Sequence, residues 1–341
     1  MPIVTNARVL FNDVPKGYPE PGRTTVYDTS LEIDVEKTLP DGGFLIKTLV
    51  LAIDPYMRHR MRDRTVKSYM PAFERGQPLE NFGVGVVLRS EHSSVSAGDH
   101  LYGLFPFQEY FVSKDPGPFR VLDNKEHLPW STYVGVCGMP GQTAHHGWRE
   151  YARPKKGDVV FVTAGAGTVG ATVIQLAKMQ GLKVIASVGS EEKVSFISSI
   201  GANVAFNYKT DSTLDILEKE GPINMHVPSS SGESLEAALE TAAVDACFIE
   251  CGMISGYNEE PYYVKNLDRI FKQGIQLCGF AVLRLQKWDD EFYKTIPGMV
   301  SRGEIQYSEN VKRGLEHVGQ AILDVQVGRN KGRTVILVQD E

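Results

Sequence analysis

Between residues 155 and 280, the hydrophobic positions of the chain follow two alternating patterns. Short and nearly all-apolar runs, such as residues 159–163 and 184–188, are typical of strands buried on both faces of a parallel sheet. The segments between these runs repeat apolar residues at helical spacing, as Val169 and Val173 do. This alternation predicts a doubly wound parallel sheet of the α/β class.

The same patterns predict further elements along the chain. The first 130 residues contain no long helical pattern, and Gly, Pro and Asp interrupt their short apolar runs, which predicts an irregular β-rich domain. Such runs lie at residues 7–10, 44–53, 83–88, 99–107 and 111–112. Beyond them, we expect helices at residues 143–150, 193–200, 213–220, 235–241, 288–302 and 311–323, and strands at residues 204–207, 246–251, 275–280 and 334–338.

Three glycines stand between the strand at residues 159–163 and the helix after it. Gly165, Gly167 and Gly170 form the pattern G-x-G-x-x-G within a strand–turn–helix–strand unit of about 30 residues. A helix amino terminus that opens on glycines exposes backbone N–H groups and the positive end of the helix dipole, which suits a pyrophosphate. The sequence therefore predicts a dinucleotide site; glycines that serve only tight packing are the alternative.

The end of the second strand indicates which dinucleotide binds. NAD sites usually carry Asp or Glu there for the ribose 2′-hydroxyl, whereas this chain has Gly189 followed by a serine. Lys193 and Tyr208 follow closely, and a cation with hydroxyl groups fits the additional phosphate of NADP. Glu191 and Glu192 are the contrary sign, although acids are also common in the first turn of a helix. We expect NADP.

The composition and net charge of the chain argue against several classes of function. The 341 residues are enough for two domains, and a hydrophobic content of 42% is ordinary for a globular protein. The net charge of −6 argues against nucleic acid or an anionic membrane as the main partner, and no run reaches the roughly 18 apolar residues of a membrane span. The chain starts without a secretory pattern and none of its four cysteines forms a C-x-x-C pair, so we expect a cytoplasmic location.

Three further features carry candidate chemistry. Residues 54–58 (DPYMR) follow an apolar strand, and loops at strand ends often build sites. Residues 61–80 are polar with charges of both signs, which fits either a mobile cover or an ordinary surface loop. His145 and His146 are adjacent, so we expect them to face different sides of their helix as core or surface residues, not to share a metal.

Seven motifs in one order resemble a known family. They are DPYMR at 54–58, GMPGxTA at 138–144, AGAGTVG at 164–170, EKV at 192–194, FNYK at 206–209, CGMISxYN at 251–258 and VGRNxGR at 327–333. This set is similar to the zinc-independent medium-chain dehydrogenases/reductases, in the subgroup of alkenal double-bond reductases and prostaglandin reductases. The resemblance implies a Rossmann NADP-binding domain at residues 133–304, inserted in a β-rich, GroES-like catalytic domain at residues 1–132 plus 305–341, with the cofactor in the cleft between them.

The resemblance also implies which residues contact the cofactor. Backbone around the glycine turn would cover the pyrophosphate, and Lys193 with Tyr208, beside Gly189, would hold the 2′-phosphate. A third group of residues would border the nicotinamide or contact other parts of the cofactor. The implied residues are Ala166, Gly167, Thr168 and Val169 for the pyrophosphate, and Pro55, Met139, Thr143, Ser229, Cys251, Gly252, Ile254, Ser255, Tyr257, Phe280, Val282 and Asn330 for the rest.

Two features bear on how far the resemblance extends. The family usually has D-N-V-G-G after its fourth strand, whereas this chain has PSSSG at 228–232, so Ser229 stands where an asparagine near the cofactor is expected. Zinc is not expected, because catalytic zinc needs three protein ligands and structural zinc four. The first 130 residues contain no cysteine, and their histidines, at positions 59, 92, 100 and 127, are scattered.

Without zinc, reduction of an activated C=C bond is the expected reaction. NADPH would deliver hydride to the β-carbon of an enal or enone, and the charge would move to the carbonyl oxygen as an enolate. A tyrosine hydroxyl, ordinarily protonated at neutral pH, could stabilise that oxygen. Tyr257 and Tyr56 are the candidates, although each could be a wall of the cleft, and the ribose hydroxyl of the cofactor could do the same work.

Two other functions remain open at this point: an NADPH quinone reductase, and an NADPH-binding protein without catalytic activity. We also expect a homodimer, because the apolar strand at 275–280 comes late in the sheet order and would leave an exposed edge that pairs with a second copy. The natural small-molecule substrate is not determined by these patterns.

Overall fold

The computed structural model describes residues 3–38, 41–228, 232–260 and 262–341. The chain divides into two compact units, one formed by residues up to Gly135 with Glu309–Glu341 and the other by Val136–Ser308. The division expected from the sequence places the breaks after residues 132 and 304, and the roles that it assigns to the two parts stay predictions.

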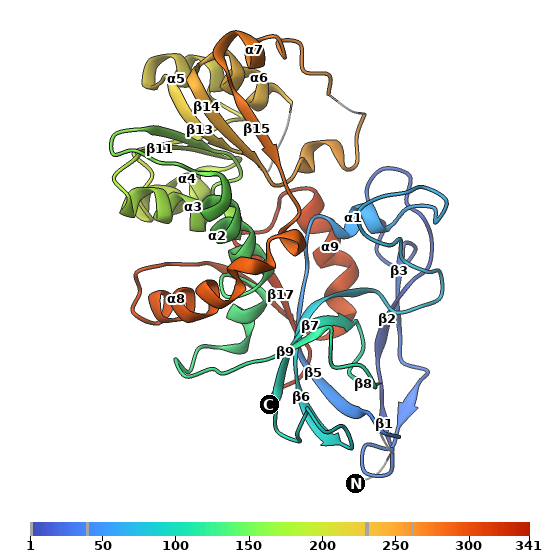
Figure 1. Ribbon diagram of the computed structural model, residues 1–341. Helices are drawn as coiled ribbons and strands as arrows, with labels where there is room; N and C mark the ends of the chain where they lie inside the picture. Colours follow the sequence, from blue (N-terminus) through green and yellow to red (C-terminus); the bar gives the residue numbers. More distant parts are fainter. Residues whose placement is uncertain (1–2, 39–40, 229–231, 261) are drawn as a thin grey trace. The chain divides into compact units, whose positions relative to one another are not determined.

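Unit 1 is built on a seven-stranded mixed sheet. Its strands follow the order β16-β17-β5-β6-β7-β9, and β8 pairs with β5 (Figure 1). Two short strand pairs, β1 with β4 and β2 with β3, complete its β-structure among the described residues. The strands are β1 (Val4–Thr5), β2 (Arg8–Phe11), β3 (Thr25–Asp28), β4 (Glu32–Ile33), β5 (Phe44–Ala52), β6 (Glu80–Ser90), β7 (His100–Pro106), β8 (Tyr110–Ser113), β9 (Phe119–Val121), β16 (Glu309–Arg313) and β17 (Arg333–Leu337).

Strand β5 is the centre of this unit because it is apolar along almost its whole length. Phe44, Ile46 and Leu51 are each fully buried in the core. Helix α9 (Val318–Gln326) adds its apolar face to the same core, and the short helix α1 (Met57–Arg60) follows directly after β5. Residues from the two ends of the chain therefore share one hydrophobic core.

Unit 2 is a six-stranded sheet in which every strand pair is parallel. The order is β12-β11-β10-β13-β14-β15, as the periodicity of residues 155–280 predicts. Its strands are β10 (Val159–Val162), β11 (Lys183–Val188), β12 (Val204–Asn207), β13 (Ile223–Val227), β14 (Ala242–Glu250) and β15 (Gln276–Gly279). The predicted position of the last strand at an edge of the sheet is confirmed.

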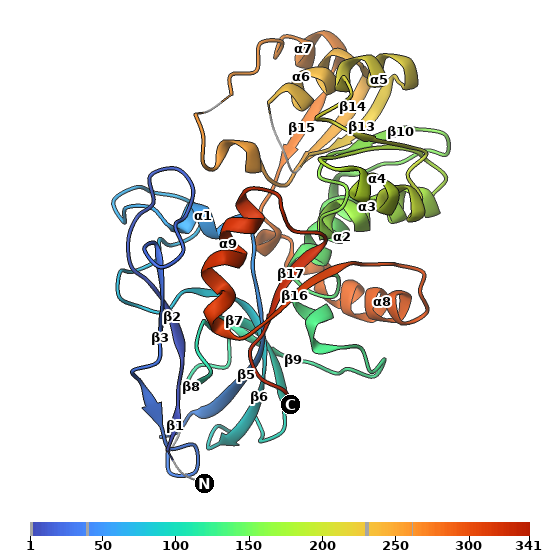
Figure 2. The same ribbon diagram turned by 180° about the vertical axis from the view of Figure 1, so that it is seen from behind.

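Helices cover both faces of this sheet, as Figures 1 and 2 show. One core cluster joins the sheet to α2, α3 and α4, and a second joins the opposite face to α5, α6 and α7. The helices of unit 2 are α2 (Met139–Tyr151), α3 (Thr168–Met179), α4 (Glu191–Ser199), α5 (Thr213–Glu220), α6 (Glu233–Glu240), α7 (Arg269–Gln273) and α8 (Asp289–Ser301).

The predicted helix at residues 311–323 is wrong in its first part. Val311 lies in β16 and pairs with Val335 of β17, and the helix α9 begins only at Val318. Gly314 separates the two elements with a backbone φ of 89°, a conformation that L side chains rarely adopt. The apolar spacing is helical, but pairing with a strand 24 residues later, counted from Val311 to Val335, outweighs it.

The two histidines of α2 do not face different sides of the helix. His145 and His146 are both buried, and their Nδ1 atoms lie 3.1 Å apart. The Nε2 atom of His146 is 2.9 Å from a carboxylate oxygen of Asp289 in α8. Burial lowers the pKa of His145 to about 4. The two histidines are buried packing residues between α2 and α8. The predicted core role is therefore correct, and the predicted orientation is wrong.

A buried ion pair joins β17 to the end of β5. The guanidinium of Arg333 donates to both carboxylate oxygens of Asp54 and also to the backbone oxygens of Val134 and Ile53. Asn81 donates to the same carboxylate at 2.9 Å. Arg333 is 6% exposed and Asp54 is 3% exposed, so this pair depends on its own hydrogen bonds and not on water.

Replacing Arg333 by Met should therefore destabilise unit 1 by about 3–5 kcal/mol, because Asp54 would stay buried and lose its charge partner. Urea unfolding combined with hydrogen exchange on β5 and β17 measures the loss. The double variant Asp54→Leu with Arg333→Met is the control, and its loss should be smaller than the sum of the two single losses. A single-variant loss below about 1 kcal/mol would contradict this role of the pair.

Candidate functional site

The glycine turn lies between β10 and α3. Gly167 is the N-cap of α3, and because it has no side chain it leaves the first amides of the helix uncovered. Gly170 packs directly on the turn, since a Cβ placed there would come within 2.7 Å of the Ala164 oxygen. Ala164 itself has a φ of 49°, which is unusual for a residue other than glycine and is often found at functional turns. Ala166, Thr168 and Val169 complete the turn.

A cluster of cations and a hydroxyl lies at the end of the neighbouring strand β11. A Cβ on Gly189 would be 3.0 Å from the Tyr208 hydroxyl and 3.2 Å from the Lys209 side chain, so only glycine lets these groups approach the backbone. Burial, together with the charge of Lys209, lowers the pKa of Lys193. The two ammonium groups are therefore close enough to repel each other, which favours an anion between them.

One of the two acids that argue against NADP, Glu191, has a hydrogen-bond partner of its own. The carboxylate of Glu191 accepts from the side-chain amide of Asn207 at 2.9 Å, so it is engaged with the neighbouring strand β12. This cluster fits the 2′-phosphate of NADP, and the glycine turn fits the pyrophosphate. Lys209 was not among the expected residues; the FNYK motif contains it, but only the folded chain brings it to Gly189.

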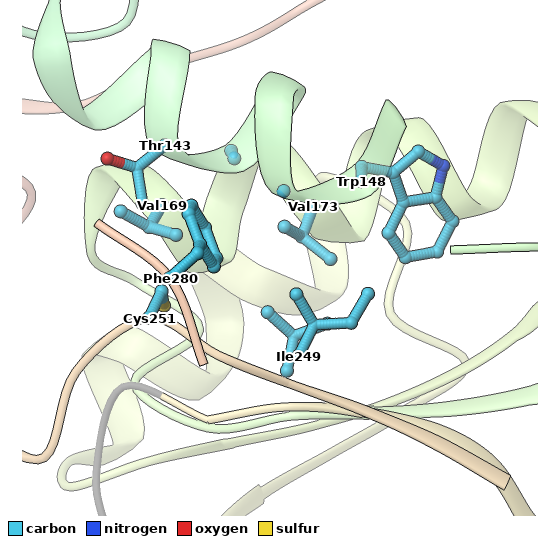
Figure 3. Close-up of a pocket in the computed structure, with 10 residues that line it drawn as sticks. Thr143, Trp148, Val169, Val173, Ile249, Cys251 and Phe280 are labelled. Atoms are coloured by element: carbon cyan, nitrogen blue, oxygen red, sulfur yellow. The ribbon is translucent and has the colours of Figure 1, made fainter. Parts of the chain in front are cut away.

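Four of the expected residues meet at one small pocket. Thr143, Val169, Cys251 and Phe280 come from four separate segments and line it together, with Trp148, Val173 and Ile249 around them (Figure 3). The cavity is about 10 Å³, which is room for about one water molecule. Phe280 packs against α2 at Gly147, where a Cβ would come within 2.6 Å of its ring. The pocket is a packing seam beside the site and is too small for a substrate.

The end of β14 carries the remaining expected residues of unit 2. The Cys251 thiol donates to the Pro228 oxygen at 3.1 Å, so it packs against the end of β13. Gly252 then leads into a short 3₁₀ turn, Ile254–Gly256, that contains Ser255. The Tyr257 hydroxyl lies over Gly252, 3.6 Å from where a Cβ would be. Other expected residues lie elsewhere: Met139 begins α2, Val282 begins the 3₁₀ turn Val282–Arg284, and Ser229 lies outside the described residues.

In unit 1, the expected residues surround the Asp54–Arg333 pair. The Tyr56 hydroxyl donates to the Asn81 side-chain oxygen, while the amide of Asn81 donates to the Ala52 oxygen and to Asp54. These bonds set the orientation of the amide, so the single proton of the Tyr56 hydroxyl is already used. Burial also raises the pKa of Tyr56.

Two other expected residues of unit 1 make backbone-directed contacts. The Pro55 oxygen accepts from Gln326, and Asn330 donates to the Gly332 oxygen within its own loop. Unit 1 thus holds Pro55 and Tyr56, which are neighbours in the chain, through separate hydrogen bonds. Across the described residues, no group of three or more His, Cys, Asp or Glu side chains could hold a metal.

The cation cluster generates a cofactor prediction. Lys193→Ala should raise the KM for NADPH by about ten- to a hundredfold, because a charge-assisted hydrogen bond contributes about 1.5–3 kcal/mol. The KM for NADH should stay nearly unchanged, since NADH lacks the phosphate. Lys209→Ala should act in the same direction, and Lys294→Ala, an exposed lysine of α8, is the control. Equal effects of Lys193→Ala on the two cofactors would contradict the assignment.

Family models match most of the chain. A model described as the N-terminal domain of oxidoreductase matches residues 8–121, and one described as zinc-binding dehydrogenase matches residues 168–300. No helix of the described residues is long and apolar enough to cross a membrane.

Relatives match over the whole length. The chain is 34% identical to an NADP-dependent oxidoreductase of Cochliobolus heterostrophus, over 98% of each chain. It is also 34% identical to an NADP⁺-dependent 2-alkenal reductase of Nicotiana tabacum, over 99% of each chain. The crystal structure of CurA from Vibrio vulnificus in complex with NADPH is 26% identical, covers 98% of this chain and 100% of its own, and superposes with a TM-score of 0.89. The chain therefore belongs to the zinc-independent medium-chain dehydrogenases/reductases, in the group of alkenal and enone double-bond reductases.

Proposed function

We propose that this protein reduces the C=C bond of α,β-unsaturated aldehydes or ketones with NADPH, and that Tyr257 stabilises the enolate. The observation that carries the proposal is the position of the Tyr257 hydroxyl over Gly252, directly after a strand of the sheet that also carries the nucleotide turn. Support comes from relatives that are named for such reductions, including (+)-pulegone reductase of Mentha piperita.

Three parts of unit 2 would hold the cofactor. The uncovered amides at the start of α3 bind the pyrophosphate, and Lys193, Tyr208 and Lys209 bind the 2′-phosphate. The backbone around Cys251 and Gly252 passes close to the nicotinamide, because a ligand in an open parallel sheet lies at the carboxyl ends of the strands. When bound, NADPH supplies the hydride for the β-carbon.

The protein itself stabilises the charge that develops on the carbonyl oxygen of the substrate. As the carbonyl oxygen gains negative charge, the Tyr257 hydroxyl donates a hydrogen bond to it, and a proton then reaches the α-carbon from solvent or a side chain. The Tyr56 hydroxyl already donates to Asn81, which favours a structural role for Tyr56. In this proposal Tyr56 orders the loop after β5.

The proposed reaction is tested by mixing protein, NADPH and an enal and following the loss of NADPH absorbance. A quinone in place of the enal tests the alternative reductase. Loss of absorbance with the enal and product reduced at the C=C bond support the proposal. Reaction with the quinone alone would favour the quinone reductase over the proposed enal reductase. No reaction with either compound would favour an NADPH-binding protein without catalytic activity.

Tyr257→Phe should lower kcat by roughly ten- to a hundredfold and leave the affinity for NADPH nearly unchanged. The loss of a main oxyanion donor typically costs 10²–10³ in rate, and solvent and the cofactor ribose share the work here. Single-turnover reduction of an enal gives the rate, and NADPH fluorescence titration gives the affinity. Tyr263→Phe is the matched control, because Tyr263 lies in the same segment and is 80% exposed. An unchanged rate, or a loss confined to NADPH affinity, would make Tyr257 a wall residue.

We also propose a homodimer formed through the free edge of β15. Leu277 on this edge is 43% exposed, and nearby Phe271 and Leu283 are 77% and 47% exposed, which leaves apolar surface beside unpaired strand atoms. Light scattering at micromolar concentration should give twice the mass of one chain, and Leu277→Lys should shift the protein toward the monomer. Val66→Lys, at an apolar site of unit 1 that is 54% exposed, is the control. A monomeric wild type would reject the proposal.

A further inference from the structure

Glu250, the last residue of β14, has an unusual environment. Both oxygens of its carboxyl group are buried and have no hydrogen-bond partner among the described residues. Its backbone is in regular structure: it pairs with Gly279 of β15, and its oxygen accepts from the Phe280 amide at 3.3 Å. The side chain, not the backbone, is therefore the unsatisfied part.

The alternation of side chains along β14 places Glu250 on one face of the sheet. Cys247 and Ile249 belong to the core cluster of α2 and α3, whereas Ala246 and Phe248 belong to the cluster of α5 and α6. Because successive side chains of a strand point to opposite faces, Glu250 lies on the Phe248 face, away from the pocket lined by Cys251. The acid is thus beneath the strand end that leads to Tyr257.

The Glu250 carboxyl stays neutral at pH 7, because burial outweighs its contact with the Gly252 backbone amide. Burial raises the pKa of Glu250 to about 8, and the Gly252 backbone amide acts in the opposite direction. Several charged groups on the elements that pack against β14 have partners of their own, and the buried His226 of β13 hydrogen-bonds the Phe161 oxygen. These engaged groups are Arg149 with Glu291 on α2 and α8, Arg269 with Glu240, and Lys272 with Asp268.

Gly252 connects this acid to the proposed catalytic hydroxyl. Its amide is close enough to influence the Glu250 carboxyl, and the position of its missing Cβ is 3.6 Å from the Tyr257 hydroxyl. A negative charge beneath Gly252 would need water or a donor. Residues 252–257 follow Glu250 almost directly, and they contain the 3₁₀ turn Ile254–Gly256.

We propose that Glu250 is a positioning residue for residues 252–257: its neutral carboxyl fills the space beneath this turn, and its ionisation displaces the turn and the Tyr257 hydroxyl with it. This proposal rests on the function proposed for Tyr257. It makes the reductase lose activity in alkaline solution through a group that touches neither substrate nor cofactor.

The pH dependence of kcat tests the proposal. Wild-type kcat should fall about tenfold for each pH unit above about 8, because only the neutral form of Glu250 holds the turn. In Glu250→Gln the side chain is neutral at every pH, so the ratio of variant to wild-type kcat should rise by the same factor. Glu218→Gln, an exposed acid of α5, is the matched control and should keep the wild-type profile. An alkaline fall that is the same in Glu250→Gln and wild type would overturn the proposal.

Two measurements on the cofactor-free protein test the buried acid without any activity. The infrared C=O band of a protonated carboxyl should be present at pH 7, lose about half of its intensity near pH 8 and be missing from Glu250→Gln. The unfolded-state pKa is near 4.5 and the folded one about 8, so the stability penalty is absent at low pH and grows as pH rises between these values. The melting-temperature advantage of Glu250→Gln, or of Glu250→Leu if the glutamine variant misfolds, should therefore increase from pH 5 to pH 8.

The two proposals fail in different ways. Absence of the infrared band at pH 7 would overturn the role of Glu250, whatever the enzyme reduces. An inactive wild type that still shows the band, with its loss near pH 8, would contradict the proposed reaction and leave the ionisation of Glu250 established. Hydrogen exchange of residues 252–257 in that protein would then decide the positioning role: exchange that accelerates above pH 8 beyond its rate in Glu250→Gln supports it, and equal exchange overturns it.

Discussion

The parallel direction of all six strands in unit 2 is the constraint on which the nucleotide site depends. Strands that run in one direction end at one edge, so the segments after β10, β11, β13, β14 and β15 are gathered there although the sequence separates them by up to about 120 residues. Helices that begin at that edge direct their uncovered amides toward it. Glycine leaves room where a neighbouring segment approaches the backbone, as the Tyr208 side chain does at Gly189 and as the backbone of Ala164 does at Gly170. The site is thus a consequence of topology, and the chemistry is supplied by a few side chains at its ends.

Unit 1 is assembled from two separate parts of the chain, because the chain leaves it after Gly135 and returns at Glu309. Pairing of β17 with β5 joins the returning segment to the sheet. The buried Arg333–Asp54 ion pair links the same two segments of the chain. The guanidinium also donates hydrogen bonds to two backbone oxygens, so few of its N–H groups remain for other partners. The carboxylate in turn orients Asn81, and Asn81 orients Tyr56. One buried ion pair therefore determines both the closure of the unit and the direction of a tyrosine hydroxyl that the motif alone could assign to catalysis.

Two sets of ionisable side chains destabilise unit 2 when no ligand is bound: a pair of lysines and a single glutamate. Both lie at the edge where the strands of the sheet have their carboxyl ends. Lys193 and Lys209 repel each other across Gly189, and a bound phosphate would reverse the sign of that interaction. Glu250 is a single acid with no such counterion among the described residues. Destabilising groups of this kind cluster at functional sites, because function and not folding retains them. His226, buried in the middle of the sheet, has no comparable relation to the edge and acts as a packed aromatic residue against Phe161.

The sequence by itself determined the α/β class, the glycine turn, the preference for NADP and the edge position of the last strand of the sheet. These properties are local: apolar periodicity, a missing carboxylate after β11 and the spacing of glycines are all contained within about 30 residues. Only the tertiary structure decided that Lys209 joins Lys193, that the Tyr56 proton is used by Asn81, that His145 meets His146, and that residues 309–313 form a strand. Each of these depends on partners that are distant in the chain or on side-chain direction. Glu250 is the clearest case, because a glutamate at a strand end is unremarkable in sequence, and only burial on a particular face of the sheet changes its proton affinity.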